Sequence, residues 1–393
     1  MSVVEDTRAP QIPFWNDPKT RSLAVQIIIV ATVALCGYYF YANAVANLAR
    51  LNQTFGYDFW GRRSGFDLSQ SLIAYTSDST YGTAIIAGFL NTLLVAVLGI
   101  IFATIIGFAV GIMRLSKNWL VAKIAMVYIE TVRNIPLLLQ LFVWYKLVLG
   151  PLPDNKGALN FANMFYLSKK GLNMPLPIFG AGAWMTIVAL IAGILAAVGI
   201  RRWAVARQMA TGEKFPHLSV GILVVLLSPF IGLLVVGWPV SLDYPTAGVF
   251  GFKGGMTILP EFLAMLVAIS IYTGSFIAEI VRAGIQAVSH GQSEAAHALG
   301  LRAGLTTRLV IIPQAMRIII PPLASQYLNL TKNSSLGIAI GYPELVYAGG
   351  TVLNQTGKAI EVVLIWMAVY LSLSLLTSLF MNWFNSRMKL VER

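Results

Sequence analysis

Charged residues are scarce in this chain. Asp, Glu, Lys and Arg make up 11% of its 393 residues, whereas 57% of the residues are hydrophobic. A soluble domain carries about 25% charged residues. The composition therefore excludes a large soluble protein and predicts a chain that crosses a membrane several times.

Residues that carry enzyme chemistry are missing as well. The single Cys36 cannot form a disulfide within the chain, and no cluster of Cys and His has the spacing of a zinc site. The phosphate loop G-x-x-x-x-G-K-[ST] is also absent, because Gly357-Lys358 has Val352 in place of the first glycine and Ala359 in place of Ser or Thr. We therefore expect no enzyme activity and no cofactor or metal bound by this chain.

Eight apolar runs approach or exceed the roughly 20 residues with which a helix crosses a bilayer. The second and third are longer than a bilayer requires, so we expect them to tilt or to extend beyond it. The sequence thus predicts an all-α, polytopic membrane protein. The runs are Leu23–Tyr41, Ala84–Met113, Val121–Val148, Trp184–Ile200, Val220–Trp238, Phe262–Ile280, Ile318–Ile340 and Val362–Trp383.

The basic residues fall mostly beside these runs and predict the orientation. With the N-terminus in the cytoplasm, the inside segments hold 17 of the 28 Lys and Arg residues and the outside segments hold 9. This bias follows the positive-inside rule, so both termini are predicted to be cytoplasmic. A miscounted span would reverse half of the chain, but basic residues directly follow the second, fourth and eighth runs. The net charge of +12 is thus a topology signal, and nucleic acid is not an expected partner.

A short polar stretch separates the sixth and seventh runs. Its residues favour a helix, which Ser289 or Ser293 can cap and Gly300 can end in a left-handed conformation. Pro313 and Pro321-Pro322 are expected to break the segments that follow. We predict a short helix outside the bilayer that moves both flanking spans, with an amphipathic loop at the membrane surface as the alternative. The residues of this stretch that would contact a partner are Glu294, Ala295, Ala296, Ala298, Gly300 and Leu301.

This stretch, which continues to Val310-Ile311-Ile312-Pro313, resembles the EAA loop of permease subunits in bacterial ABC importers, which docks on the ATPase. The flanking segments Tyr128–Phe142, Ala278–Val288 and Leu330–Leu336 resemble the polar amino-acid subfamily of these permeases, the histidine and glutamine type. Taken together, the chain is similar to the Q-type permease of general L-amino-acid importers.

The resemblance implies a type I ABC transmembrane domain over residues 84–384, with an inserted helix pair near 184–238. Residues 1–83 would form a cytoplasmic segment, the first helix and a periplasmic loop, and residues 385–393 a cytoplasmic tail. The implied location is the bacterial inner membrane. The implied partners are a second homologous permease that completes a heterodimer, two ATPase subunits that hold ATP and Mg, a periplasmic amino-acid-binding protein, L-amino acids and membrane lipid.

Polar side chains within apolar runs are costly and usually have a partner or a function. Glu130 with Arg133, and Glu279 with Arg282, have the spacing of ion pairs on one helix, and we favour a structural role for them. Amide, hydroxyl and ammonium groups suit the charged ends of an amino acid. The predicted substrate-pathway residues are Gln140, Tyr272, Thr273, Asn329, Lys332, Asn333 and Ser334.

Two other interpretations of the polar residues remain open. An ion-coupled secondary amino-acid transporter would also need a polar pathway, but it would more often show an internal repeat and broken helices. A structural membrane scaffold has no use for the polar stretch or for polar residues within spans. Gly107 and Gly111 form a small-residue face on the second run, which predicts close helix packing.

Overall fold

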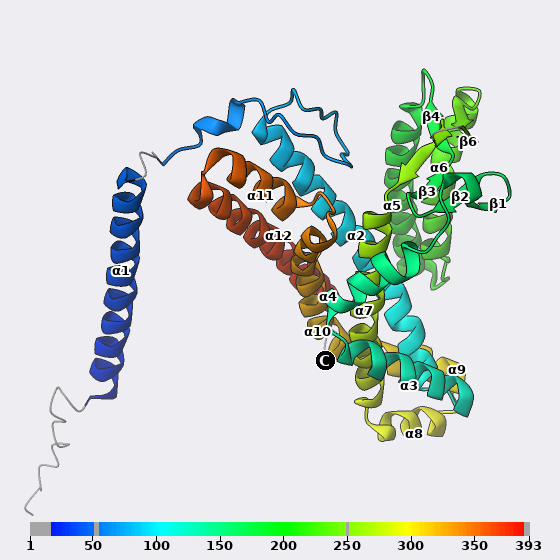
Figure 1. Cartoon of the computed structure of the whole chain (residues 1–393). Helices are drawn as coiled ribbons and strands as arrows, with labels where there is room; N and C mark the ends of the chain where they lie inside the picture. Colours follow the sequence, from blue (N-terminus) through cyan, green and yellow to red (C-terminus); the bar gives the residue numbers. More distant parts are fainter. Residues whose placement is uncertain (1–16, 51–54, 249–250, 389–393) are drawn as a thin grey trace, which may run out of the picture.

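The computed structural model describes residues 17–50, 55–248 and 251–388. Within these ranges, seven helical segments are long and apolar enough to cross a membrane, and a bent pair supplies an eighth span (Figure 1). This confirms the predicted polytopic all-α class. Most of the predicted N-terminal cytoplasmic segment, residues 1–16, and residues 389–393 of the tail lie outside the described part. The long helices are α1 (Pro18–Arg50), α2 (Tyr81–Arg114), α5 (Met185–Thr211), α6 (His217–Val235), α7 (Pro260–Gln286), α10 (Ile312–Asn333) and α12 (Ala359–Met388).

The third predicted span is not one continuous helix. It consists of α3 (Trp119–Asn134), followed by α4 (Leu137–Phe142) and the π-helical turn η3 (Val143–Leu149), and the two parts meet at 105°. The break lies at Ile135-Pro136, where Ile135 is extended. A proline disfavours helical geometry in the residue before it, so the predicted single helix Val121–Val148 is wrong at this point.

Prolines act differently in the seventh span. The helix α10 runs through Pro321 and Pro322, and Pro313 lies in its first turn, directly after a π-helical turn at 307–311. The prediction that these prolines interrupt the span is therefore wrong. Buried Ile319, Ile320 and Leu323 hold this part of α10 in the core, because tertiary packing and the remaining helical bonds outweigh the lost ones. The helix is preceded by α9 (Ala303–Thr306) and the π-turn η5 (Thr307–Ile311), and it is followed by the 3-10 turn η6 (Ser334–Ile340).

The centre of the bundle is the seam between α2 and α7. A side chain at Gly107 would meet Ile277 and the carbonyl of Gly274, and one at Gly111 would meet Val281 and the carbonyl of Ala278. The two helices thus pack backbone against backbone, which confirms the predicted packing role of both glycines. By contrast, α1 buries none of its apolar stretch against the rest of the chain.

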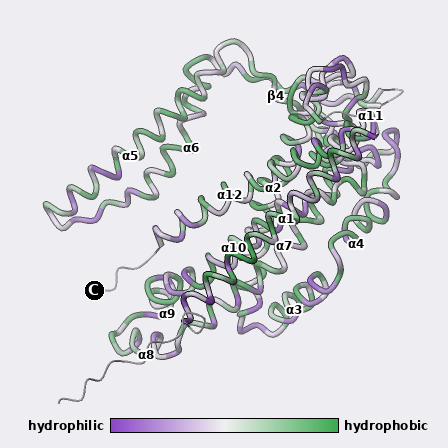
Figure 2. Tube along the Cα trace, turned by 90° about the vertical axis from the view of Figure 1, so that its left-hand side faces the viewer, coloured by the Kyte–Doolittle hydropathy of each residue, from purple (hydrophilic) through white to green (hydrophobic). Residues whose placement is uncertain are grey.

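The inserted helix pair α5–α6 stands on a stem of short strands (Figures 1 and 2). Strand β3 (Gly171–Met174) pairs with β8 (Met256–Ile258), and β4 (Leu176–Phe179) pairs with β5 (Val240–Asp243), each antiparallel. The segments that precede α5 and follow α6 are therefore paired with each other at the base of the insertion. Sequence analysis predicted no strands here. The remaining strands are β1 (Leu159–Phe161), β2 (Phe165–Ser168), β6 (Thr246–Ala247) and β7 (Phe252–Lys253).

At the other side of the bundle, α11 (Leu345–Thr356) packs between α2 and α12. Buried Asn91 on α2 holds this region, because its amide donates to the carbonyl oxygens of Gln70 at 2.9 Å and Pro343 at 2.8 Å. The loop before α2 is fixed by Lys358, whose ammonium lies 3.2 Å from Asp58. That hydrogen bond is the main cause of the lowered pKa of Asp58.

Candidate coupling helix and groove

The helix α8 (His290–Ala298) connects α7 to α9 at the lower end of the bundle in Figure 1. Its end is defined by Gly300, which has a φ of +76°. The N–H of Leu301 donates to the carbonyl of Ala296 at 3.0 Å, and that of Gly300 donates to His297 at 2.9 Å. These two bonds form a Schellman motif, so the predicted left-handed end is confirmed. Ser289 occupies the N-cap position, but its side chain makes no capping bond.

The predicted contact residues of α8 do not all face the same way. Ala296 is buried against the bundle, Leu301 is half-buried, and Glu294, Ala295, Ala298 and Gly300 are exposed. The predicted contact residues did not include Leu299, the C-cap residue of α8, which is 82% exposed. Nearby Leu305 and Leu309 are exposed as well. The end of the bundle therefore presents small and apolar side chains beside charged ones, which is the composition of a protein-docking surface.

Two contacts tie α8 to its own turn and to the next span. The Glu294 carboxylate lies 3.0 Å from the imidazole of His290, and both side chains are exposed. The amide of Gln314 in α10 donates to the side-chain oxygen of Gln292 at 3.0 Å. One hydrogen bond thus links α8 to α10, and the short turn at 287–289 connects it to α7.

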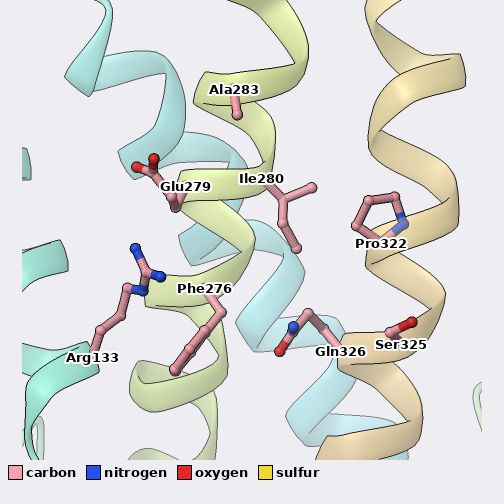
Figure 3. Close-up of a pocket in the computed structure, with 8 residues that line it drawn as sticks. All are labelled: Arg133, Phe276, Glu279, Ile280, Ala283, Pro322, Ser325 and Gln326. Atoms are coloured by element: carbon pink, nitrogen blue, oxygen red, sulfur yellow. The ribbon is translucent and has the colours of Figure 1, made fainter.

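Further into the bundle, α3, α7 and α10 surround an open groove of about 340 Å³. Arg133 enters it from α3 and points toward Glu279 of α7, as Figure 3 shows. The guanidinium of Arg282 donates to Glu279 through Nε at 2.9 Å and through Nη2. The groove thus holds one carboxylate between two arginines. Its full lining is Arg133, Phe276, Glu279, Ile280, Ala283, Pro322, Ser325 and Gln326.

The structure forms only one of the two ion pairs that were predicted on single helices. Glu279 pairs with Arg282, but Glu130 and Arg133 form no ion pair in the described structure. Arg133 instead lies over the ring of Phe276, 5.0 Å from its centroid. The prediction of a local pair at this position is therefore wrong, since an aromatic face on α7 and the field of Glu279 draw the guanidinium away from α3.

The predicted substrate-pathway residues are not gathered in one cavity. Gln140, Thr273 and Ser334 are buried, Tyr272 and Asn333 are half-buried, and Asn329 and Lys332 are exposed. Several of them already have partners within the chain. Gln140, for example, donates to the carbonyl oxygens of Val132 at 2.8 Å and Ile135 at 2.9 Å. It bridges the break between α3 and α4.

Sequence analysis missed two residues of the groove, Ser325 and Gln326. They lie on α10 one turn before Asn329, so a polar stripe on this otherwise apolar helix was the available signal. It also missed Asn91 and Glu344. Glu344 is fully buried and caps α11, because its carboxylate accepts from the N–H groups of Val346 and Tyr347.

Comparison with known proteins identifies the family of this chain. A family model described as "binding-protein-dependent transport system inner membrane component" matches residues 187–390. The general L-amino acid transport system permease protein AapQ of Rhizobium johnstonii is 54% identical over 96% of this chain and 94% of its own length. The glutamate/glutamine/aspartate/asparagine transport system permease protein BztB of Rhodobacter capsulatus is 43% identical, with 96% of each chain covered. A crystal structure of an amino acid ABC transporter with histidines has 23% identity and a TM-score of 0.47, over 78% of this chain and 95% of that one. The chain therefore belongs to the inner-membrane components of binding-protein-dependent transport systems, the permeases of ABC importers.

Proposed function

We propose that this permease forms the translocation pathway of an ATP-driven importer of L-amino acids. The observation that carries the proposal is α8, a helix with a defined end and exposed Leu299, held between two spans. The names of AapQ and BztB support amino acids as the substrate class. The broken span α3–α4 is a feature that ion-coupled carriers also show, but the family to which the chain belongs favours the ATP-driven importer.

The proposal includes partners that this chain needs. A second, homologous permease completes a heterodimer, two ATPase subunits bind ATP and Mg, and a periplasmic binding protein delivers the amino acid. The charge bias of the sequence places both termini and α8 in the cytoplasm. In that orientation, α8 faces the ATPase and the strand stem faces the periplasm.

The geometry supplies a route for the force. When the ATPase subunits close on ATP, they displace α8, and the Gln292–Gln314 contact carries the displacement to α10. The same end of α8 is joined to α7 by the short turn at 287–289, and its other end leads through α9 and η5 into α10. These helices form two walls of the groove, so their movement changes its width. A partner can favour one state only by binding α8 differently in the two states.

The groove offers both charges that an amino acid requires. Arg133 can bind a carboxylate, and Glu279 can accept hydrogen bonds from an ammonium group. Gln326 adds an amide that donates and accepts. A carboxylate already compensated by two arginines leaves the groove with a net positive charge, which favours neutral and acidic amino acids over basic ones.

Reconstitution into liposomes tests the proposed function. Uptake of a labelled L-amino acid should require the ATPase subunits, the binding protein and ATP on the side of α8. An ATPase variant that binds ATP without hydrolysing it serves as the matched control and should give no sustained uptake. Uptake by this chain in vesicles that lack any ATPase would refute the proposal.

A pair of glutamine variants separates structural from pathway roles. Gln140→Leu should lower the thermal midpoint, because two part-buried carbonyl oxygens lose their donor at a cost of about 1–3 kcal/mol. The apparent KM for uptake should stay within twofold. Gln326→Leu, in the groove, should raise KM with little change in thermal stability. A raised KM for Gln140→Leu at unchanged stability would return Gln140 to the substrate pathway.

A further inference from the structure

The inserted hairpin carries a groove of its own, distant from the coupling helix in sequence and not used by the proposed mechanism. A cavity of about 370 Å³ lies between α5 and α6, at the end of the hairpin nearest Arg201 and His217. Apart from these two residues, every residue of its lining is apolar or glycine. The groove is thus hydrophobic along its length, with a cationic residue at one end.

Packing between the two helices explains where the groove begins. Near the stem, the helices touch closely, since a side chain at Gly193 would meet Ser228 and one at Gly232 would meet Ala189. Toward the turn the contact loosens, and a Cβ at Gly221 would lie 3.5 Å from that of Ala197, at ordinary van der Waals distance. The missing side chain of Gly221 leaves the floor of the groove open.

Charge is concentrated at the same end of the hairpin, where Figure 2 shows hydrophilic residues at the turn far from β4. Arg207 pairs with Glu213 at 2.7 Å and lies over the ring of Trp203. Arg201 forms no ion pair with any described residue and is exposed. A guanidinium at the end of an apolar groove is suited to bind an anion that carries an apolar chain.

The depth of Arg201 matches the surface of a bilayer. Exposed Trp184 and Trp238 mark the stem end of the hairpin, as aromatic residues do at a membrane interface. At 1.5 Å per residue, Arg201 lies about 25 Å further along α5. The hydrocarbon core is about 30 Å thick, so Arg201 is placed close to the opposite headgroups. In the proposed orientation these belong to the cytoplasmic leaflet, which carries the anionic lipids.

We propose that this groove is a binding site for an anionic phospholipid of the cytoplasmic leaflet. One acyl chain lies between α5 and α6, and the phosphate is bound by Arg201, with His217 beside it. The inference rests on the proposed orientation but not on amino-acid transport.

Photolabelling of the full-length chain in nanodiscs tests this site. Phosphatidylglycerol and phosphatidylcholine, each with the same photoactivatable acyl chain, are compared, and labelled peptides are mapped by mass spectrometry. Labelling of residues 194–226 is normalised to that of α12, which reports general lipid contact. We expect phosphatidylglycerol to label this segment at least about fivefold more than phosphatidylcholine does, the ratio that one basic residue near a membrane surface provides.

Three variants test whether the preference for phosphatidylglycerol arises in the groove. Arg201→Gln should remove the preference for phosphatidylglycerol, and Gly221→Leu should reduce labelling by both lipids, because the new side chain fills the floor. Arg202→Gln is the matched control, since it removes the same charge one residue away but does not line the groove, and it should keep the preference. Unchanged labelling of α12 shows that each variant is folded.

Three results would overturn the proposal. Equal labelling by the two lipids in the unmodified chain would show ordinary boundary lipid, and this comparison needs no variant to fold. An equal effect of Arg202→Gln and Arg201→Gln would indicate diffuse surface charge. A crosslink from the groove to another protein chain of the assembled importer, in place of lipid, would identify an interface between subunits.

Discussion

Replacing Gly300 with proline should reduce ATP-driven uptake to background, while the subunit still inserts and assembles. Gly300 has a φ of +76°, whereas proline requires about −65°. The substitution also removes the N–H that donates to His297 at 2.9 Å. The Schellman end of α8 is then lost together with a hydrogen bond worth about 0.5–1.5 kcal/mol, and the helix no longer stands at a fixed angle between α7 and α10.

A substitution by asparagine at the same position is the matched control. A side chain at Gly300 meets nothing within 4 Å, and asparagine tolerates the left-handed conformation better than most residues do. Gly300→Asn should therefore keep at least about half of the uptake, because the strain of one such residue is about 1–2 kcal/mol at most. Proteoliposomes measure uptake and binding-protein-stimulated ATP hydrolysis together. Normal coupling of the two in Gly300→Pro would show that α8 is not the element on which the ATPase acts.

The outline of the fold is predictable because hydrophobicity is a local property. Every apolar run except the third became one helical segment, and the end of α8 followed from one glycine at the right distance from a helix-forming segment. The bend at Pro136 was also encoded locally, but the long apolar run Val121–Val148 dominated the interpretation. Pro321 and Pro322 show the opposite error, since buried neighbours keep α10 helical through both of them.

The strand stem could not be predicted in this way. Its pairing joins Gly171–Met174 to Met256–Ile258, two segments separated by the whole inserted hairpin. Strands this short carry little periodicity, and their partners are fixed only when α5 and α6 bring them together.

In the groove as well, contacts within one helix could be predicted from the sequence and contacts between helices could not. The pair of Glu279 with Arg282 is visible at i,i+3 because both residues lie on one helix. The placement of Arg133 over Phe276 joins α3 to α7, and such a contact has no signature in the sequence of either helix. Residues assigned to a pathway by polarity alone, such as Gln140, proved to serve the backbone around them.

Replacing Gly107 with leucine should destabilise the subunit by about 3 kcal/mol. A Cβ at this position would lie 2.4 Å from Cγ2 of Ile277 and 3.0 Å from the carbonyl oxygen of Gly274. The carbonyl belongs to the backbone of α7, so α7 must move away, and the groove that contains Glu279 moves with it. The loss should appear as a lower thermal midpoint in detergent, measured by size-exclusion chromatography after heating. It should also appear as weaker amino-acid uptake by the remaining folded protein.

Gly199→Leu in α5 is the control, because it makes the same change in a spanning helix where a side chain meets nothing within 4 Å. A thermal midpoint for Gly107→Leu equal to that of Gly199→Leu would mean that α2 and α7 are not held in backbone contact at the centre of the bundle.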